Sequence, residues 1–100
     1  MAATVATGAG LALPALAATS TSHYTVQAQF DNNPGSGASR VWVYSGSNNN
    51  GRVEYQFYDG TTRSLQTGWH TASSTDPGQD IWRIRACIDF GSGWDCGDWT

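Results

Sequence analysis

Apolar and polar residues alternate with a period of two along much of the chain after residue 22. The apolar positions of the stretch 23–30 are Tyr24, Val26, Ala28 and Phe30. The same alternation recurs in residues 52–58 and 81–88, and it is typical of half-buried β-strands. Residues 40–45 are apolar on both sides, which favours a central strand. Residues 61–67 are more polar, and we expect them at a sheet edge.

Turn-forming residues separate these stretches. Asn50-Gly51 and Asp59-Gly60 are strong signals for tight hairpin turns. Residues 71–79 are polar and contain Asp-Pro-Gly, so they predict a loop. About six short strands joined in this way predict a small all-β fold, either an antiparallel sandwich or a partly open barrel.

Residues 80–100 predict a terminal hairpin that carries the chain's two cysteines. Cys87 precedes a Gly-rich turn and Cys96 follows it, so the two strands bring them opposite each other, within disulfide reach. A metal site is the alternative, but two cysteines without a nearby histidine make a poor one. A redox pair is disfavoured because the spacing is far from Cys-x-x-Cys. We therefore expect a structural disulfide, Cys87–Cys96.

The first residues of the chain are typical of a secretory leader. Residues 1–18 are uncharged, small and apolar, and Ala15-Leu16-Ala17 fits the small-x-small cleavage rule. They lack the basic region that normally opens a signal peptide, and a short buried helix is the alternative. We expect residues 1–18 to be a leader and the remaining chain to be extracellular, where a disulfide persists.

The rest of the chain predicts two parts. Residues 19–39 are expected to form an N-terminal strand followed by a flexible linker, because residues 31–39 consist mostly of turn-formers. Residues 40–100 are expected to form the β-domain. The strand at 23–30 carries no charge to protect it as a sheet edge. It is expected either to pair within its own sheet or to be donated to the sheet edge of a partner.

The charge pattern limits the possible functions. The formal net charge is −3, and all five basic residues are arginines without a basic cluster, which argues against nucleic acid and anionic membranes. The histidines and serines fit no metal-binding or nucleophile motif, so we expect no catalysis, no cofactor and no bound metal. The aspartates near the terminal turn, Asp89, Asp95 and Asp98, suit a carboxylate pair or a calcium site, but Asp is also a common turn-former.

Aromatic residues are the main candidates for binding. Five tryptophans are many for so small a core. We expect Trp82 and Trp99 to pack against the disulfide, whereas Trp69 and Trp94 suit burial and binding equally. Exposed Trp and Tyr suit sugar stacking or a protein hot spot. The predicted partner-binding residues are Tyr24, Val26, Ala28 and Phe30 of the first strand, with Trp69 and Trp94.

The terminal motif adds a family resemblance. Arg-x-Arg-Ala-Cys at 83–87 and Cys-x-x-Trp at 96–99, with the leader and short strands, resemble small secreted β-proteins of actinobacteria such as Streptomyces. Basic charge carried only by arginine is consistent with a GC-rich genome. Within that group the chain is similar to the adaptor subunit of umbrella toxin particles. The resemblance implies a β-domain that bridges a lectin subunit and a large stalk subunit, with residues 19–39 engaging a neighbour.

These observations favour a secreted, non-enzymatic protein-interaction module whose partners are other secreted proteins. One alternative is a carbohydrate-binding module that holds polysaccharide on exposed tryptophans. Another is a small hydrolase inhibitor that presents residues 71–79 to the cleft of an enzyme.

Overall fold

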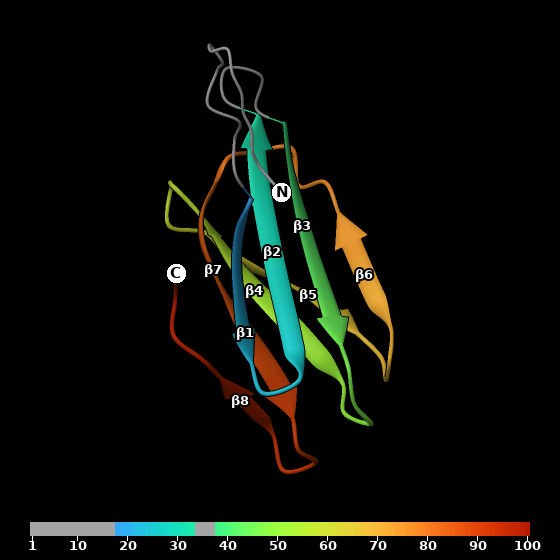
Figure 1. The fold of residues 1–100 in the computed structure, drawn as a ribbon. Coiled ribbons are helices and arrows are strands. Elements are labelled where there is room, and N and C mark those ends of the chain that lie inside the picture. The colour runs from blue at the N-terminus through green and yellow to red at the C-terminus, as the bar shows by residue number, and fades with distance from the viewer. Residues whose placement is uncertain (1–17, 34–37) are drawn as a thin grey trace, which may run out of the picture.

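The protein is a two-layer β-sandwich. A computed structural model describes residues 18–33 and 38–100, which form two four-stranded antiparallel sheets packed face to face (Figure 1). Sheet A has the strand order β1-β2-β3-β6 and sheet B the order β5-β4-β7-β8. The strands are β1 (Thr19–His23), β2 (Val26–Asn33), β3 (Ala38–Ser45), β4 (Gly51–Phe57), β5 (Thr62–Thr67), β6 (Ala72–Thr75), β7 (Ile81–Asp89) and β8 (Trp94–Cys96). The predicted all-β class and antiparallel sandwich are confirmed. Within the described residues, no helix is long and apolar enough to cross a membrane.

The core lies between the sheets and follows the predicted alternation. The buried apolar side chains are Val26, Ala28 and Phe30 of β2, Val41 and Val43 of β3, Val53, Tyr55 and Phe57 of β4, and Ile81, Ile84, Ala86 and Ile88 of β7. As predicted, residues 40–45 lie in a strand with a neighbour on each side, and β5 is an edge of its sheet. Removing this apolar surface from water is the main term that stabilises the two layers.

The N-terminal strands belong to this sandwich. β1 pairs with β2 from Thr19 opposite Phe30 to His23 opposite Val26, and β2 pairs with β3 along its whole length. The structure therefore agrees with the first interpretation of the uncharged strand, that it pairs within its own sheet. A donated strand is not what the structure shows, because β2 has a neighbour on each side and its apolar face is core. The described residues of the segment 19–39 pack in the same sandwich as the strands of residues 40–100.

Two strands were not expected from the sequence. The predicted first strand begins at residue 23 and β6 falls in the predicted loop of residues 71–79, yet β1 and β6 are paired edge strands of sheet A. The predicted linker is also shorter than residues 31–39, because β2 continues to Asn33 and β3 begins at Ala38. Residues 34–37 of that linker and residues 1–17 of the predicted leader lie outside the described residues.

A β-bulge reverses the predicted orientation of two side chains at the start of β7. The alternation placed Trp82 with Ile84 and put Ile81 on the opposite face. In the structure the register shifts between Gln56 and Phe57, leaving Trp82 as the extra residue of β7. Ile81 is therefore buried in the core and Trp82 is exposed, instead of packing against the disulfide as predicted.

The terminal hairpin has the predicted disulfide. Cys87 of β7 lies opposite Cys96 of β8, and their sulfur atoms are 2.03 Å apart. β8 has only three paired residues, so the disulfide is a substantial part of what joins it to sheet B.

Candidate functional site

One end of the sandwich gathers four chain connections, and we call it the loop end. It consists of residues 24–25, 46–50, 68–71 and 90–93, at the lower end of Figure 1. Backbone hydrogen bonds join these connections to one another. The Gly46 N–H donates to the Thr25 carbonyl (2.9 Å), and the His70 N–H donates to the Ser47 carbonyl (3.3 Å). Residues far apart in the sequence thus form one continuous surface.

Three large aromatic side chains project from the loop end. Tyr24 is 69% exposed, Trp69 59% and Phe90 50%. The Tyr24 and Phe90 rings meet edge to face, with centroids 5.1 Å apart. Trp69 and Phe90 also line a hollow of about 280 Å³ with the Asn48–Asn50 segment. The loop end therefore combines apolar rings with amide groups that donate and accept hydrogen bonds.

The backbone of the loop end is strained at two aromatic residues. Tyr24 (φ 54°) and His70 (φ 49°) are the non-glycine residues with positive φ in the described part of the chain. This conformation costs of order 1–3 kcal/mol per residue and persists only where surrounding contacts impose it. His70 is held by a hydrogen bond between Nε2 and the Asn48 Oδ1 atom (2.8 Å). Both residues are thus fixed in conformations that an isolated loop would rarely adopt.

The asparagine-rich connection is fixed from both sides. The Asn49 side chain donates to the Asp89 carbonyl (2.9 Å), and the Ser45 hydroxyl donates to the Asn49 carbonyl (2.6 Å). The Ser47 hydroxyl donates to the Asn49 Oδ1 atom (3.0 Å). These bonds fix the Asn48–Asn50 segment, which lines the hollow with Trp69 and Phe90, in the free protein.

Two aspartates of the terminal turn have structural partners. Asp89 accepts a hydrogen bond from the Gly91 N–H (2.7 Å), which closes the β7–β8 turn. The Asp95 Oδ1 atom lies 2.7 Å from the His23 Nε2 atom, which links β8 of sheet B to β1 of sheet A. Both carboxylates therefore hold chain segments together.

Trp94 is the first residue of β8, directly after the 90–93 connection, and its ring lies against the outer face of sheet B. The Arg52 guanidinium lies over its ring, 4.3 Å from the centroid, and the side chain is half-buried. Trp99 lies in the same layer, with Arg83 and Arg85 each 4.7 Å from its ring centroid. Cation–π contacts of this kind cover arginine side chains, so the two tryptophans form part of a closed surface layer.

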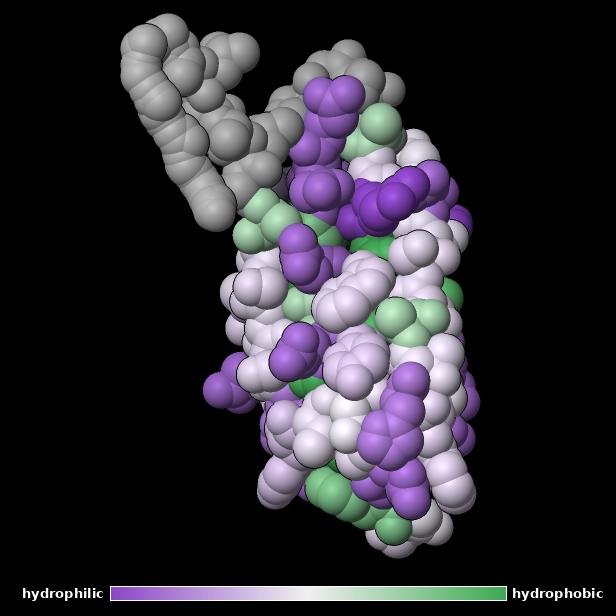
Figure 2. Space-filling model, turned by 45° about the vertical axis from the view of Figure 1, so that its right-hand side comes forward, coloured by the Kyte–Doolittle hydropathy of each residue, from purple (hydrophilic) through white to green (hydrophobic). Residues whose placement is uncertain are grey.

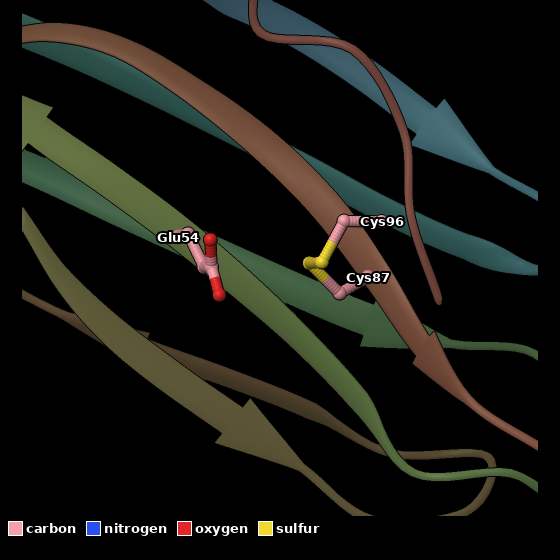
Figure 3. A group of neighbouring side chains, drawn as sticks. All are labelled: Glu54, Cys87 and Cys96. Atoms are coloured by element: carbon pink, nitrogen blue, oxygen red, sulfur yellow. A yellow bond between two sulfur atoms is a disulfide. The ribbon is translucent and has the colours of Figure 1, made fainter. Parts of the chain in front are cut away.

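An ion-pair network lies beneath that layer. The Glu54 carboxylate accepts from Arg52 (2.7 Å) and from Arg85 (2.6 Å). Glu54 and the sulfurs of Cys87 and Cys96 also lie within 4.8 Å of one another, the group drawn in Figure 3. The sulfurs are bonded to each other and the carboxylate is paired with arginines. The disulfide and the ion pairs therefore explain why these three side chains lie close together.

The structure separates the sequence-predicted binding residues into three places. Tyr24 and Trp69 lie together at the loop end, and Trp94 lies on sheet B. Val26, Ala28 and Phe30 are core residues and present no side chain to a partner. Phe90 was missed, although an apolar ring between Asp and Gly in a turn was a usable signal.

Comparison of the chain with protein-family models, with curated proteins and with solved structures finds no match. Its function must therefore be inferred from the surfaces described above.

Proposed function

We propose that this chain is a secreted, non-enzymatic interaction module that binds another protein through its loop end. The observation that supports this most is the exposure of Tyr24, Trp69 and Phe90 on three separate connections at one end of the sandwich. Interface hot spots are enriched in tryptophan and tyrosine. Large aromatic side chains that are exposed to solvent gain the free energy of burial only when a partner covers them.

The rigidity of the loop end supports the same proposal. The strained backbone at Tyr24 and His70 and the bonds around Asn49 order the surface in the free protein. Less conformational entropy is then lost on association, so more of the contact energy appears as affinity. The loop-end segments carry no arginine, which favours a partner surface that is apolar or neutral and polar.

The resemblance to umbrella-particle adaptors gives the proposal a narrower form. In that form the partner is another secreted subunit of an extracellular toxin particle, either a lectin or a large stalk protein. The disulfide is compatible with an extracellular location. Because β1 pairs with β2 and β2 with β3, the proposed contact surface moves from the strands of residues 19–39 to the loop end, which keeps Tyr24 and Thr25 of that segment.

Affinity capture with matched variants tests the proposal. The immobilised full chain is exposed to culture supernatant of its producing organism, and retained proteins are identified by mass spectrometry. We expect Trp69→Ala and Phe90→Ala to lose a protein that the wild type retains. The control is Tyr58→Ala, which removes a ring from the β4–β5 turn that is more exposed (69%) than Trp69 or Phe90, and it should retain that protein.

Two results of this capture count against the proposal. One is equal retention by the wild type and both loop-end variants. The other is loss of the partner in Tyr58→Ala alone. Thermal unfolding of each variant is measured alongside, because a binding surface predicts lost capture without a matching loss of stability.

A further inference from the structure

The outer faces of the two sheets use their polar side chains differently. On sheet B, Glu54 is paired with two arginines, and the Gln56 side chain accepts from Arg83 (2.6 Å). On sheet A, the amides of Gln27 and Gln29 make no side-chain hydrogen bond within the described residues. The same holds for the outward hydroxyls there, Ser20, Ser22 and Ser74. Sheet A thus presents a row of amides and hydroxyls free to bond a ligand.

Two aromatic rings lie in the middle of this row. Trp42 and Tyr44, two residues apart on β3, have ring planes within 11° of each other and centroids 6.1 Å apart. Gly46 makes room for this arrangement, because a Cβ there would lie 3.3 Å from the Tyr44 Cε2 atom. Figure 2 looks onto this side and shows pale aromatic rings bordered by purple polar side chains.

The strand register places polar groups on both sides of the rings. Gln29 of β2 lies opposite Trp42, and Gln27 lies opposite Tyr44. On the other side, Ser74 of β6 lies opposite Trp42. The partly exposed rings therefore form a strip with hydrogen-bonding groups along its edges.

The surface is hollowed beside Trp42. One depression of about 380 Å³ is bordered by Ser20, Ser22, Gln27, Gln29 and Trp42. A second, of about 240 Å³, is bordered by Gln29, Phe30, Asp31, Arg40 and Trp42. The side chain of Trp42 thus borders both depressions, which run across strands β1 to β3.

We propose that this face of sheet A binds a neutral oligosaccharide chain. The flat rings of Trp42 and Tyr44 would lie against the apolar faces of successive sugar residues. The amides of Gln27 and Gln29 both donate and accept, which suits sugar hydroxyls. A few placed polar groups beside aromatic surface is the usual composition of a small-ligand site.

The charge distribution selects a neutral ligand. The strip of Gln27, Gln29, Trp42, Tyr44 and Ser74 contains no charged side chain. Next to it, the Arg40 guanidinium is engaged by Asp76, with its Nε atom 2.9 Å from the Asp76 Oδ1 atom. Among the described residues that border the strip, an acidic or sulfated glycan would find no unpaired cation and would meet the Asp31 carboxylate. An apolar protein surface would meet amides and hydroxyls. This site borders the loop end at Gly46 but shares no residue with it.

Affinity electrophoresis tests the proposal directly. The full chain is run in native gels containing soluble starch, laminarin, hydroxyethylcellulose or galactomannan, with heparin as the anionic comparison. We expect retardation by at least one neutral glycan, with about fivefold weaker binding in Trp42→Ala, which corresponds to about 1 kcal/mol for one stacked ring. Trp42→Phe should keep most of the binding. The control, Trp82→Ala, removes a tryptophan exposed on the other sheet and should bind as the wild type does.

Three outcomes overturn the proposal: no retardation by any of the four neutral glycans, retardation by heparin alone, or retardation unchanged in Trp42→Ala. If Trp42→Ala lacks a cooperative thermal transition, the double variant Gln27→Ala/Gln29→Ala decides, because it alters only exposed amides. The double variant should be retarded several-fold less than the wild type and should have the same melting temperature. If the double variant is retarded as strongly as the wild type, the proposed site is refuted. Loss of a captured protein in Trp42→Ala, without glycan binding by the wild type, would assign the face to a protein partner instead.

Discussion

Removing the Cys87–Cys96 disulfide should destabilise the sandwich by an amount that the structure allows us to calculate. The cysteines are nine positions apart in the sequence, so the bond closes a loop of about ten residues when both cysteines are counted. The chain-entropy relation gives about 2.7 kcal/mol for such a loop at 25 °C. A domain of this size has a total stability of roughly 4–12 kcal/mol, so the loss is a large fraction of it. The melting temperature should fall by roughly 10–20 °C.

Urea unfolding monitored by tryptophan fluorescence measures this loss. Oxidised wild type is compared with reduced wild type and with the double variant Cys87→Ala/Cys96→Ala. The reduced protein and the variant should share a lowered midpoint. Their dependence of unfolding free energy on urea should be steeper, because the unfolded chain without the cross-link exposes more surface.

Two results would contradict a stabilising effect of the cross-link that acts through the unfolded chain. If oxidised wild type and the double variant unfold at the same midpoint, the cross-link does not constrain the unfolded chain as argued. If reduced wild type is as stable as oxidised wild type while the variant is weaker, the loss comes from the cavity left by the buried Cys87 side chain.

Three further changes test the packing and the charges. Gly51→Ala should cost about 1–3 kcal/mol, because its Cβ would lie 3.1 Å from Val26, whereas Gly68→Ala, with nothing within 4 Å, should cost much less by the same urea assay. Glu54→Gln should lower the free energy of unfolding by about 1–3 kcal/mol, between the values for surface and buried ion pairs. A loss below about 0.5 kcal/mol, roughly the value of a surface pair, would contradict a stabilising role of the Glu54 ion pairs. The Thr61 N–H bond to Asp59 lowers the pKa of that carboxyl from 3.8, so its contribution to stability is present at neutral pH and is lost as pH falls through the lowered pKa. Asp59→Asn should therefore narrow the difference in urea midpoint between about pH 5 and about pH 2, and an unchanged difference would refute the assignment.

The periodic strands of the sandwich were predictable because the alternation of apolar and polar side chains indicates which face is buried. Val53, Tyr55 and Phe57 lie inward as their alternation predicted, and the cysteines paired because a hairpin leaves them opposite each other. β1 and β6 show no such alternation. Their sequences, TSTSH and ASST, are short, polar and paired on one side only, so neither contributes a buried stripe.

The candidate sites were harder to predict, because they depend on register and on where loops meet. The bulge opposite Gln56 exchanged the expected faces of Ile81 and Trp82, and one inserted residue is invisible to a period-two pattern. Tyr24 and Trp69 were chosen individually as aromatics, but only the folded topology brings Phe90 to within 5.1 Å of Tyr24. The strip of Trp42 and Tyr44 needed the pairing of β2, β3 and β6 before its polar borders could be recognised.

Site-specific photocrosslinking tests the central claim, that the loop end is the partner-binding surface. A benzophenone amino acid is placed at Trp69, at Phe90 or, as control, at Tyr58, and each protein is irradiated in the producer's culture supernatant. We expect one shared covalent adduct from positions 69 and 90 and none from position 58. An adduct from position 58 alone, or none from either loop-end position, would contradict the claim.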